Sequence, residues 1–302
     1  MTVESFSRSA DYDLRSLNHE RRMLEEYRRG AMSDGSLLQP QANACWRAAS
    51  FEWQLYKDAE TARRLWGEGA RALAQGFSRR PVGFDPSPDQ FILALHFAIA
   101  AREREAFTSL ALSHHNLRVG GSREARAFQN SRAHFRLVEG YALVARALIE
   151  RQSAPARAAT ESLDAARAES DQGWWQRQYP EPLDAAWRIS EHDAVCALLL
   201  NVARRIIRAS DVAGDVSQTR LDDSTAGEFA RVVDETLLRL EEFTEHDVNH
   251  HPKLYLWLPG LALCALATSA GLPMSWLDER HEAQSRKGYA RLPLALLRNP
   301  QH

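Results

Sequence analysis

Residues 254–276 read LYLWLPGLALCALATSAGLPMSW and contain no charged side chain. The stretch is about as long as a membrane span, since ~20 apolar residues cross the hydrocarbon core of a bilayer. Two breaks argue against insertion. The Pro-Gly pair at 259–260 interrupts the run, and AGLP at 270–273 supplies a glycine cap followed by a proline. The segment between them, 261–270, has the length of a helix packed on all sides, so we predict a buried central helix; a membrane or interfacial segment is the alternative.

The remainder of the chain has helical periodicity and no convincing alternating strand. The predicted helices cover residues 11–29, 41–55, 58–75, 91–102, 103–114, 122–151, 153–171, 189–210 and 225–243. Their pairing resembles helical repeats of the tetratricopeptide kind, although the strict 34-residue consensus is absent. We therefore predict an all-α fold of irregular stacked helical hairpins. Residues 1–35 form a charged helix and turn, and residues 36–302 form a single domain.

Local signals set several expected boundaries. Gly76 is expected to close the first hairpin, and Ser87 and Thr225 each begin a capping box at a helix N-terminus. Residues 211–224 are polar and are expected to form a linker.

Composition limits the function classes. An apolar fraction of 44% with 26% charged residues is ordinary for a soluble globular protein. Residues 1–6 lack the basic start and apolar stretch of a secretory signal, so the expected compartment is the cytoplasm. A net charge of −2 gives no electrostatic reason to expect nucleic acid as a partner. Cys45, Cys196 and Cys264 lie far apart among apolar residues, which predicts buried thiols rather than disulfides or a metal cluster.

Histidines beside acidic residues suggest one catalytic class. The pair His192-Asp193 is typical of HD-type metal-dependent phosphohydrolases, which also need an upstream histidine and a later aspartate. His114 or His134, and then Asp234, fill those positions only by free choice. We therefore predict no catalytic residue, no metal and no cofactor, and keep the hydrolase as the alternative.

Two segments are candidates for binding a protein partner. Acidic residues gather near and within the helix that ends around residue 247: Asp222, Asp223, Glu241, Glu242, Glu245 and Asp247. Negative charge at a helix C-terminus opposes the macrodipole, so stability alone does not favour this arrangement and a basic partner is predicted. The second segment is an aromatic loop at 173–182 that contains Trp174, Trp175 and Tyr179.

The segments GLALCALA at 260–267, the glycine turn at 270–271 and YARLP at 289–293 resemble the ending of the immunity protein 49 family of bacterial polymorphic toxin systems. The tryptophan- and alanine-rich hairpin at 44–74 is compatible with the N-terminal half of that family. The resemblance implies a cytoplasmic immunity protein that binds a cognate toxin domain and occludes its active site, with no catalytic residues to carry over. A helical-repeat scaffold for another partner is a further alternative, and the oligomeric state is left open.

Overall fold

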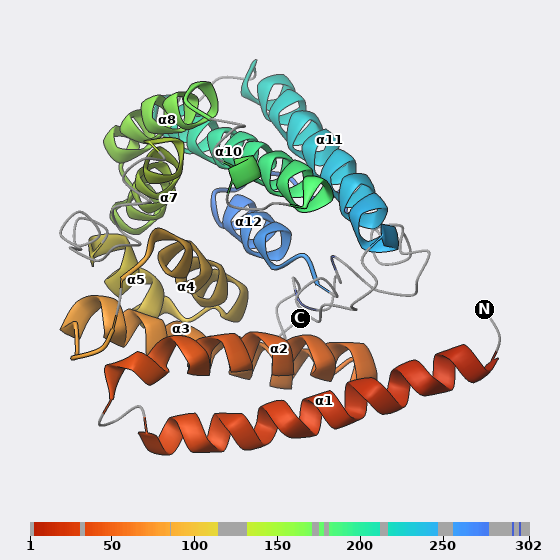
Figure 1. The fold of residues 1–302 in the computed structure, drawn as a ribbon. Helices are drawn as coiled ribbons and strands as arrows, with labels where there is room; N and C mark the ends of the chain where they lie inside the picture. The colour runs from red at the N-terminus through yellow and green to blue at the C-terminus, as the bar shows by residue number, and fades with distance from the viewer. Residues whose placement is uncertain are drawn as a thin grey trace.

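The computed structural model describes residues 3–30, 34–84, 86–113, 132–170, 175–177, 181–211, 217–246, 256–277, 292 and 296. Over these residues the chain forms helices that pack against one another, and it contains no strand. Their buried side chains form one continuous hydrophobic core (Figure 1). The prediction of an all-α single domain is confirmed.

Three long helices form one side of the molecule: α1 (Val3–Gly30), α2 (Leu38–Tyr56) and α3 (Ala59–Arg79) (Figure 1). Leu17 and Leu24 of α1 are buried in the same core as α2 and α3. The sequence-based boundary at residue 35 falls in the connection between α1 and α2, where a short 3-10 helix, η1 (Gly35–Leu37), begins.

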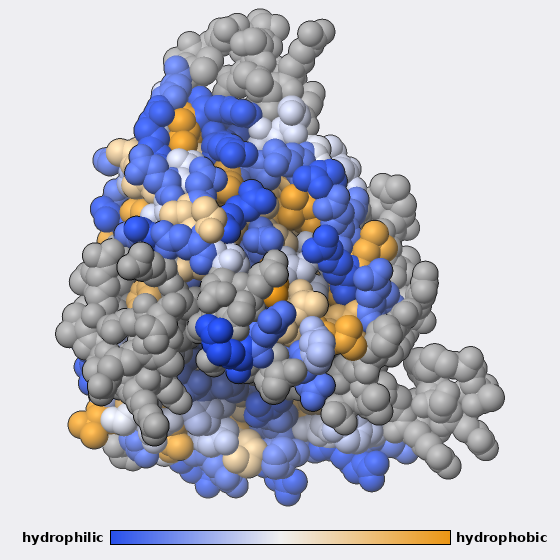
Figure 2. Space-filling model, turned by 45° about the horizontal axis from the view of Figure 1, so that its top comes forward, coloured by the Kyte–Doolittle hydropathy of each residue, from blue (hydrophilic) through white to orange (hydrophobic). Residues whose placement is uncertain are grey.

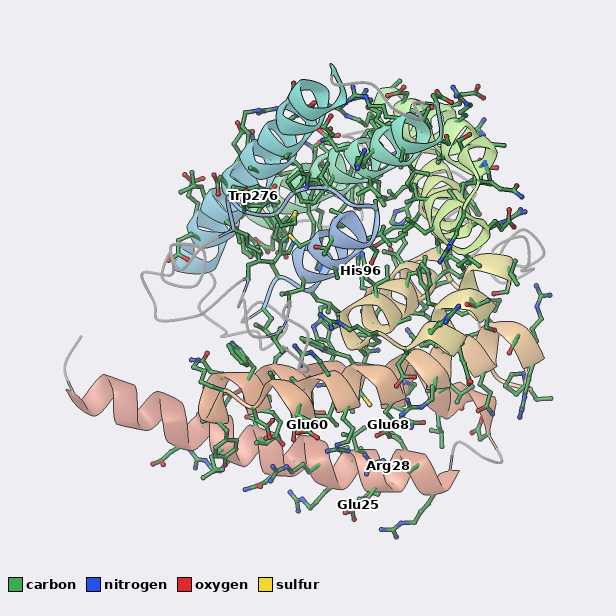
Figure 3. The ribbon with its side chains drawn as sticks, turned by 180° about the vertical axis from the view of Figure 1, so that it is seen from behind. Glu25, Arg28, Glu60, Glu68, His96 and Trp276 are labelled. Atoms are coloured by element: carbon green, nitrogen blue, oxygen red, sulfur yellow. The ribbon has the colours of Figure 1, made fainter. Side chains whose placement is uncertain are left out.

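Charged pairs also attach α1 to the next two helices. Three arginine–glutamate pairs, each 2.6 Å long, make this attachment: Arg21–Glu52, Arg47–Glu20 and Arg28–Glu68. Figure 3 shows Arg28 on α1 close to Glu68 on α3. The carboxylates of Glu20 and Glu52 are almost fully buried, whereas the guanidinium groups stay partly exposed. The arginines therefore compensate carboxylates that would otherwise be buried without a partner.

Four helix ends carry a basic residue in the left-handed conformation: Lys57, Arg80, Arg102 and Arg151. At these ends the basic side chain lies near the helix C-terminus, where positive charge is favoured. The expected closure at Gly76 is wrong, because α3 continues to Arg79 and Arg80 caps it. Gly76 instead gives room to the Phe84 ring, which a side chain at position 76 would strike.

The second and third hairpins follow the predicted pairing. Helices α4 (Pro88–Ala101) and α5 (Arg104–Ser113) form one, and the Ser87 hydroxyl caps α4 by accepting from the Gln90 N–H at 3.3 Å, as predicted. Helices α7 (Arg132–Glu150) and α8 (Ser153–Ala168) form the other. The predicted segments 122–131 and 171 lie outside the described residues.

Helices α10 (Pro182–Asp211) and α11 (Ser217–His246) are longer than predicted. Helix α10 begins seven residues before the expected position 189, with a proline, which the first helical turn tolerates. The expected linker is helical from Ser217, so Thr225 is not an N-cap. Its hydroxyl accepts a hydrogen bond from Arg208 Nη1 of α10, an interaction between helices that sequence periodicity does not reveal.

The uncharged stretch forms α12 (Leu258–Ser269), which lies between α4 and α10 in the centre of the molecule (Figure 1). The predicted buried helix is confirmed. Gly271, with φ +77°, ends it, and the Leu272 N–H donates to the Ala267 carbonyl at 2.9 Å. The Pro-Gly pair at 259–260 does not break the helix but lies in its first turn, where the missing proline N–H costs nothing.

Across the described part of the chain, no helix has both the length and the apolar character to span a bilayer. The face in Figure 2 is mainly hydrophilic, with apolar side chains scattered among charged ones. Within the described ranges, most of the large apolar side chains are buried in the core.

Candidate functional site

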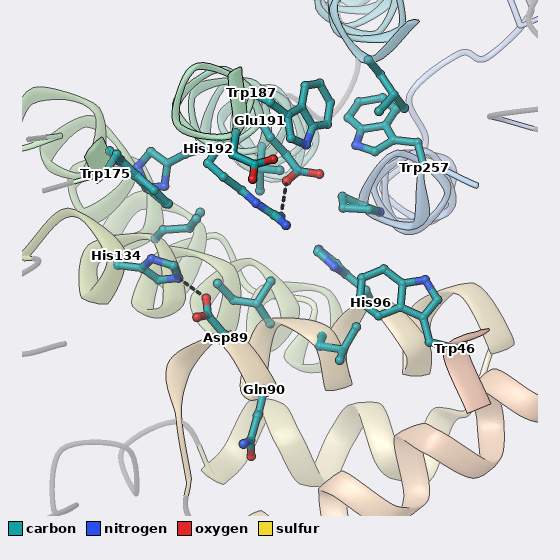
Figure 4. Close-up of a pocket in the computed structure, with 18 of the residues that line it drawn as sticks. Trp46, Asp89, Gln90, His96, His134, Trp175, Trp187, Glu191, His192 and Trp257 are labelled. Atoms are coloured by element: carbon teal, nitrogen blue, oxygen red, sulfur yellow. Dashed lines mark hydrogen bonds and ion pairs between the residues drawn. The ribbon is translucent and has the colours of Figure 1, made fainter. Parts of the chain in front are cut away.

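A cavity of 1120 Å³ opens between the first layer of helices and the α10–α12 group. We call it the central recess; Figure 4 shows the side chains that line it. Four of the eight tryptophans of the chain contribute to its wall: Trp46, Trp175, Trp187 and Trp257. Tryptophan is enriched where proteins bind other molecules, so this concentration marks the recess as a candidate binding site.

Three helices begin at the recess. Pro88, Pro182 and Pro259 lie in the first turns of α4, α10 and α12. Pro182 and Pro259 line the cavity, as do both neighbours of Pro88 in the chain. Asp89 and Asp184, in two of these first turns, complement the positive ends of the helix dipoles. Helix starts therefore explain why part of the acidic charge lies here.

The recess carries more negative than positive charge. Its wall contains four carboxylates and one guanidinium, those of Asp89, Glu181, Asp184, Glu191 and Arg188. Glu191 lies in the third turn of α10, away from any helix start, so the macrodipole does not account for it. The excess charge predicts a ligand with a basic group.

Asp89 and His134 are in close contact at the recess wall. His134 Nε2 lies 3.0 Å from Asp89 Oδ1, and the dashed line in Figure 4 joins them. The Asp89 side chain is 62% exposed, but the surface it exposes lines the recess, so protein still surrounds it. Burial raises the pKa of Asp89, and the stronger combined effect of His134 and Arg188 leaves that pKa below its ordinary value. Asp89 is therefore a carboxylate at neutral pH.

Glu191 has the opposite balance. Burial raises its pKa, and Arg188, whose Nη1 donates to Glu191 Oε2 at 3.3 Å, only partly opposes this. Net, the pKa of Glu191 lies above its ordinary value. A carboxylate placed in this environment gains from a further cation.

An aromatic cluster forms the wall on the α7 side. The Trp175 ring centroid lies 5.9 Å from that of His134 and 5.6 Å from that of His192. Burial, with the charge of His134, lowers the pKa of His192 to about 4, so this imidazole is neutral at pH 7. The Cys196 Sγ lies 3.8 Å from His192 Nε2, but burial raises the pKa of the thiol far above its usual range. The pair is therefore not an activated thiolate.

All three cysteines are buried and free, as predicted. Cys45 and Cys264 also have pKa values raised by burial. None of them lines the recess.

Two residues of the predicted acidic cluster, Glu241 and Glu242, lie beside the recess. Glu242 is exposed on α11 and Glu241 is half-buried, while Leu240 and Phe243 of the same turn line the cavity. The Phe243 ring stacks on Trp187 at 5.8 Å between centroids. The side chains of Asp222, Asp223 and Glu245, and the whole of Asp247, lie outside the described residues.

Of the three residues predicted in the aromatic loop, the structure describes Trp175. Its side chain is only 5% exposed, packs between two histidines and lines the recess. Trp174 and Tyr179 lie outside the described residues.

The residues considered for a phosphohydrolase come together only in part. His134 and His192 lie with their ring centroids 6.1 Å apart, whereas Asp193 and Asp234 do not line the recess. His114 lies outside the described residues. Within the described ranges, no group of three or more histidine, cysteine or acidic side chains is arranged to hold a metal ion.

Sequence reasoning did not identify Asp89, Arg188 and Glu191 as site residues. Asp89 belongs to a predicted capping segment, Glu191 is only the neighbour of the His192-Asp193 pair considered for a phosphohydrolase, and no motif includes Arg188. No protein-family model, curated protein or solved structure matches the chain.

Proposed function

We propose that this protein binds and neutralises a cognate bacterial toxin domain, as the resemblance to the immunity protein 49 family implies, by covering the active site of the toxin. The observation that carries the proposal is the acidic excess of the recess, continued on the adjoining surface by Glu241 and Glu242. Two exposed leucines, Leu183 on α10 and Leu238 on α11, add apolar area to these two helices. Protein interfaces combine apolar and charged side chains, so both kinds are available for contact here.

Each part of this surface has a separate role in the proposed mechanism. The carboxylates attract a basic toxin surface and speed the encounter, since complementary charge acts mainly on the association rate. The tryptophans of the recess supply the buried contacts that slow dissociation. The toxin is then inactive because its catalytic groups are covered, without any chemical step.

Reversal of Glu241, Glu242 and Glu245 to lysine should slow association with the toxin by about tenfold or more and reduce its dependence on salt. Protection of cells that express the toxin should fall in parallel. The fold should survive, because the apolar stripe of α11 from Phe229 to Phe243 is unchanged. Stopped-flow association at several salt concentrations and a growth assay measure these effects.

The matched control reverses Glu161 and Asp164 of α8 and its C-cap residue Glu169, three exposed acids that do not line the recess. This variant has the same change in net charge and should associate at nearly the normal rate. If both triple variants bind and protect equally well, α11 does not contribute to the interface. If the unaltered protein neither binds nor protects against the toxin encoded beside it, the proposed function is wrong.

A second candidate function is hydrolysis of a small molecule, favoured by the Asp89–His134 pair. A carboxylate that orients an imidazole is the usual arrangement of a general base. Stoichiometric transition metal that is lost on His192→Ala, together with turnover of phosphate esters, would favour this hydrolase. A helical-repeat scaffold, the third reading, would bind a partner without protecting cells from a toxin.

A further inference from the structure

We infer that the central recess receives an arginine side chain from a protruding loop of the partner, so that one guanidinium anchors the complex. This inference rests on the proposed function, which supplies the partner. It adds the chemistry of the contact and the residues that make it. The recess contains tryptophan side chains, carboxylates and a buried polar atom without a partner. Together these groups suit the flat shape, the charge and the N–H donors of one guanidinium.

The aromatic wall fits a guanidinium better than an ammonium. Trp187 and Trp257 are buried on the α10 and α12 sides, while Trp46 lies on the opposite wall beside His96 (Figure 4). Indole is the strongest aromatic partner for cations, and the flat arginine head stacks on such rings more often than lysine does. A side chain that enters between these walls therefore meets tryptophan side chains on both of them.

Carboxylates supply the polar contacts. Asp89 and Glu191 face the same space, and the Arg188 guanidinium, bound to Glu191, also influences Asp89 electrostatically (Figure 4). The protein thus already holds one guanidinium among these acids. Glu181 and Asp184 also line the recess, so the four carboxylates outnumber the single guanidinium of Arg188. A second guanidinium can form charge-assisted, paired hydrogen bonds with the remaining oxygen atoms.

A buried polar atom in the wall, His96 Nε2, has no hydrogen-bond partner among the described residues, and its side chain is only 5% exposed. Burial lowers the pKa of His96 to about 3, so its ring is neutral and offers one nitrogen as an acceptor. Buried polar groups that lack partners are rare and costly, and a polar group brought by a ligand removes that cost.

The size of the recess indicates a side chain that comes with its backbone. At 1120 Å³ it slightly exceeds the ~300–1,000 Å³ usual for small-molecule pockets. An arginine fills only part of this volume, and the adjoining residues of a loop fill the rest. Leu240 and Phe243, which line the recess from α11, link it to the acidic surface of the proposed interface.

The test uses the full chain and two small probes, N-acetyl-arginine-N-methylamide and its citrulline counterpart. Citrulline has nearly the same shape but no charge, and NMR titration or calorimetry measures both. The arginine probe should bind at least about tenfold more tightly than citrulline. The corresponding lysine probe should bind more weakly than arginine. Equal binding of arginine and citrulline, or of arginine and lysine, overturns the inference.

Variants locate the binding. Glu191→Gln should weaken the arginine probe by about tenfold or more, because it removes one charged acceptor. The fold should tolerate this change, since glutamine has nearly the same shape and burial already raises the pKa of Glu191. Asp89→Asn serves as the second recess variant. Glu235→Gln, at an exposed acid paired with Arg231 outside the recess, is the matched control and should bind the probe normally.

The same variants separate this inference from the proposed function. If the toxin binds but Glu191→Gln and Asp89→Asn leave its affinity and that of the probe unchanged, the arginine contact is wrong and the immunity function stands. If the probe binds in the recess but no neighbouring toxin binds, the cation site stands and the proposed function is wrong.

Discussion

Trp66→Ala should lower the free energy of unfolding by about 3–5 kcal/mol, the usual cost of removing a large buried aromatic side chain. Trp66 lies in α3 and is fully buried. By volume, it is the largest of the fully buried side chains among the described residues. Its neighbours come from a close-packed helical interior that collapses only partly around a void of this size. Urea denaturation followed by circular dichroism measures the change.

Two further variants make this experiment specific. Tyr56→Ala removes an aromatic ring that is 54% exposed and should change stability by no more than about 0.5 kcal/mol. Trp66→Phe should cost much less than Trp66→Ala, because the indole N–H has no partner among the described residues and phenylalanine removes that unpaired donor. Equal effects of Trp66→Ala and Tyr56→Ala would show that α3 does not pack as described.

Gly140→Ala should destabilise the protein by about 1–3 kcal/mol, although alanine is the better helix former. A methyl group at position 140 of α7 would lie 2.5 Å from Cγ of Leu163 on α8. Leu163 is fully buried, so it has no free space into which to move. The clash therefore outweighs the helix preference of about 1 kcal/mol.

Gly227→Ala is the control for helix propensity alone. Gly227 lies in α11, is exposed, and a methyl group there would meet no atom within 4 Å. This variant should be stabilised by up to about 1 kcal/mol. Opposite signs for the two substitutions support close contact between α7 and α8, whereas stabilisation by both would contradict it.

Most of the fold was predictable because helices have local signals. The apolar period of α3 and the cap at Ser87 act over a few residues, and both agree with the structure. The uncharged run of α12 identified the centre of the core for the same reason. The predicted helix ends were wrong where contacts between distant residues determine them. Gly76 lies within α3 beside Phe84, and Thr225 accepts a hydrogen bond from Arg208 of another helix.

The recess was largely unpredictable from sequence. Trp46, Asp89, His134, Glu191 and Trp257 are dispersed over more than 200 positions and meet only when five helices pack. No spacing rule joins such residues. Sequence reasoning weighed His134, or alternatively His114, together with His192, but for a metal chemistry whose other residues do not join them. The acidic end of α11 was recognised because its charge opposes the helix dipole, which is itself a local signal.

The attachment of α1 gives this helix a different response to the solvent from the rest of the molecule. Its arginine–glutamate pairs have half-exposed guanidinium groups, which dissolved ions screen. The apolar contacts of the core, to which Leu17 and Leu24 of α1 also belong, are instead strengthened by excluded salts such as sulfate. Salts therefore act in opposite directions on the two kinds of contact that hold α1, whereas the helices around α12 depend mainly on the apolar kind.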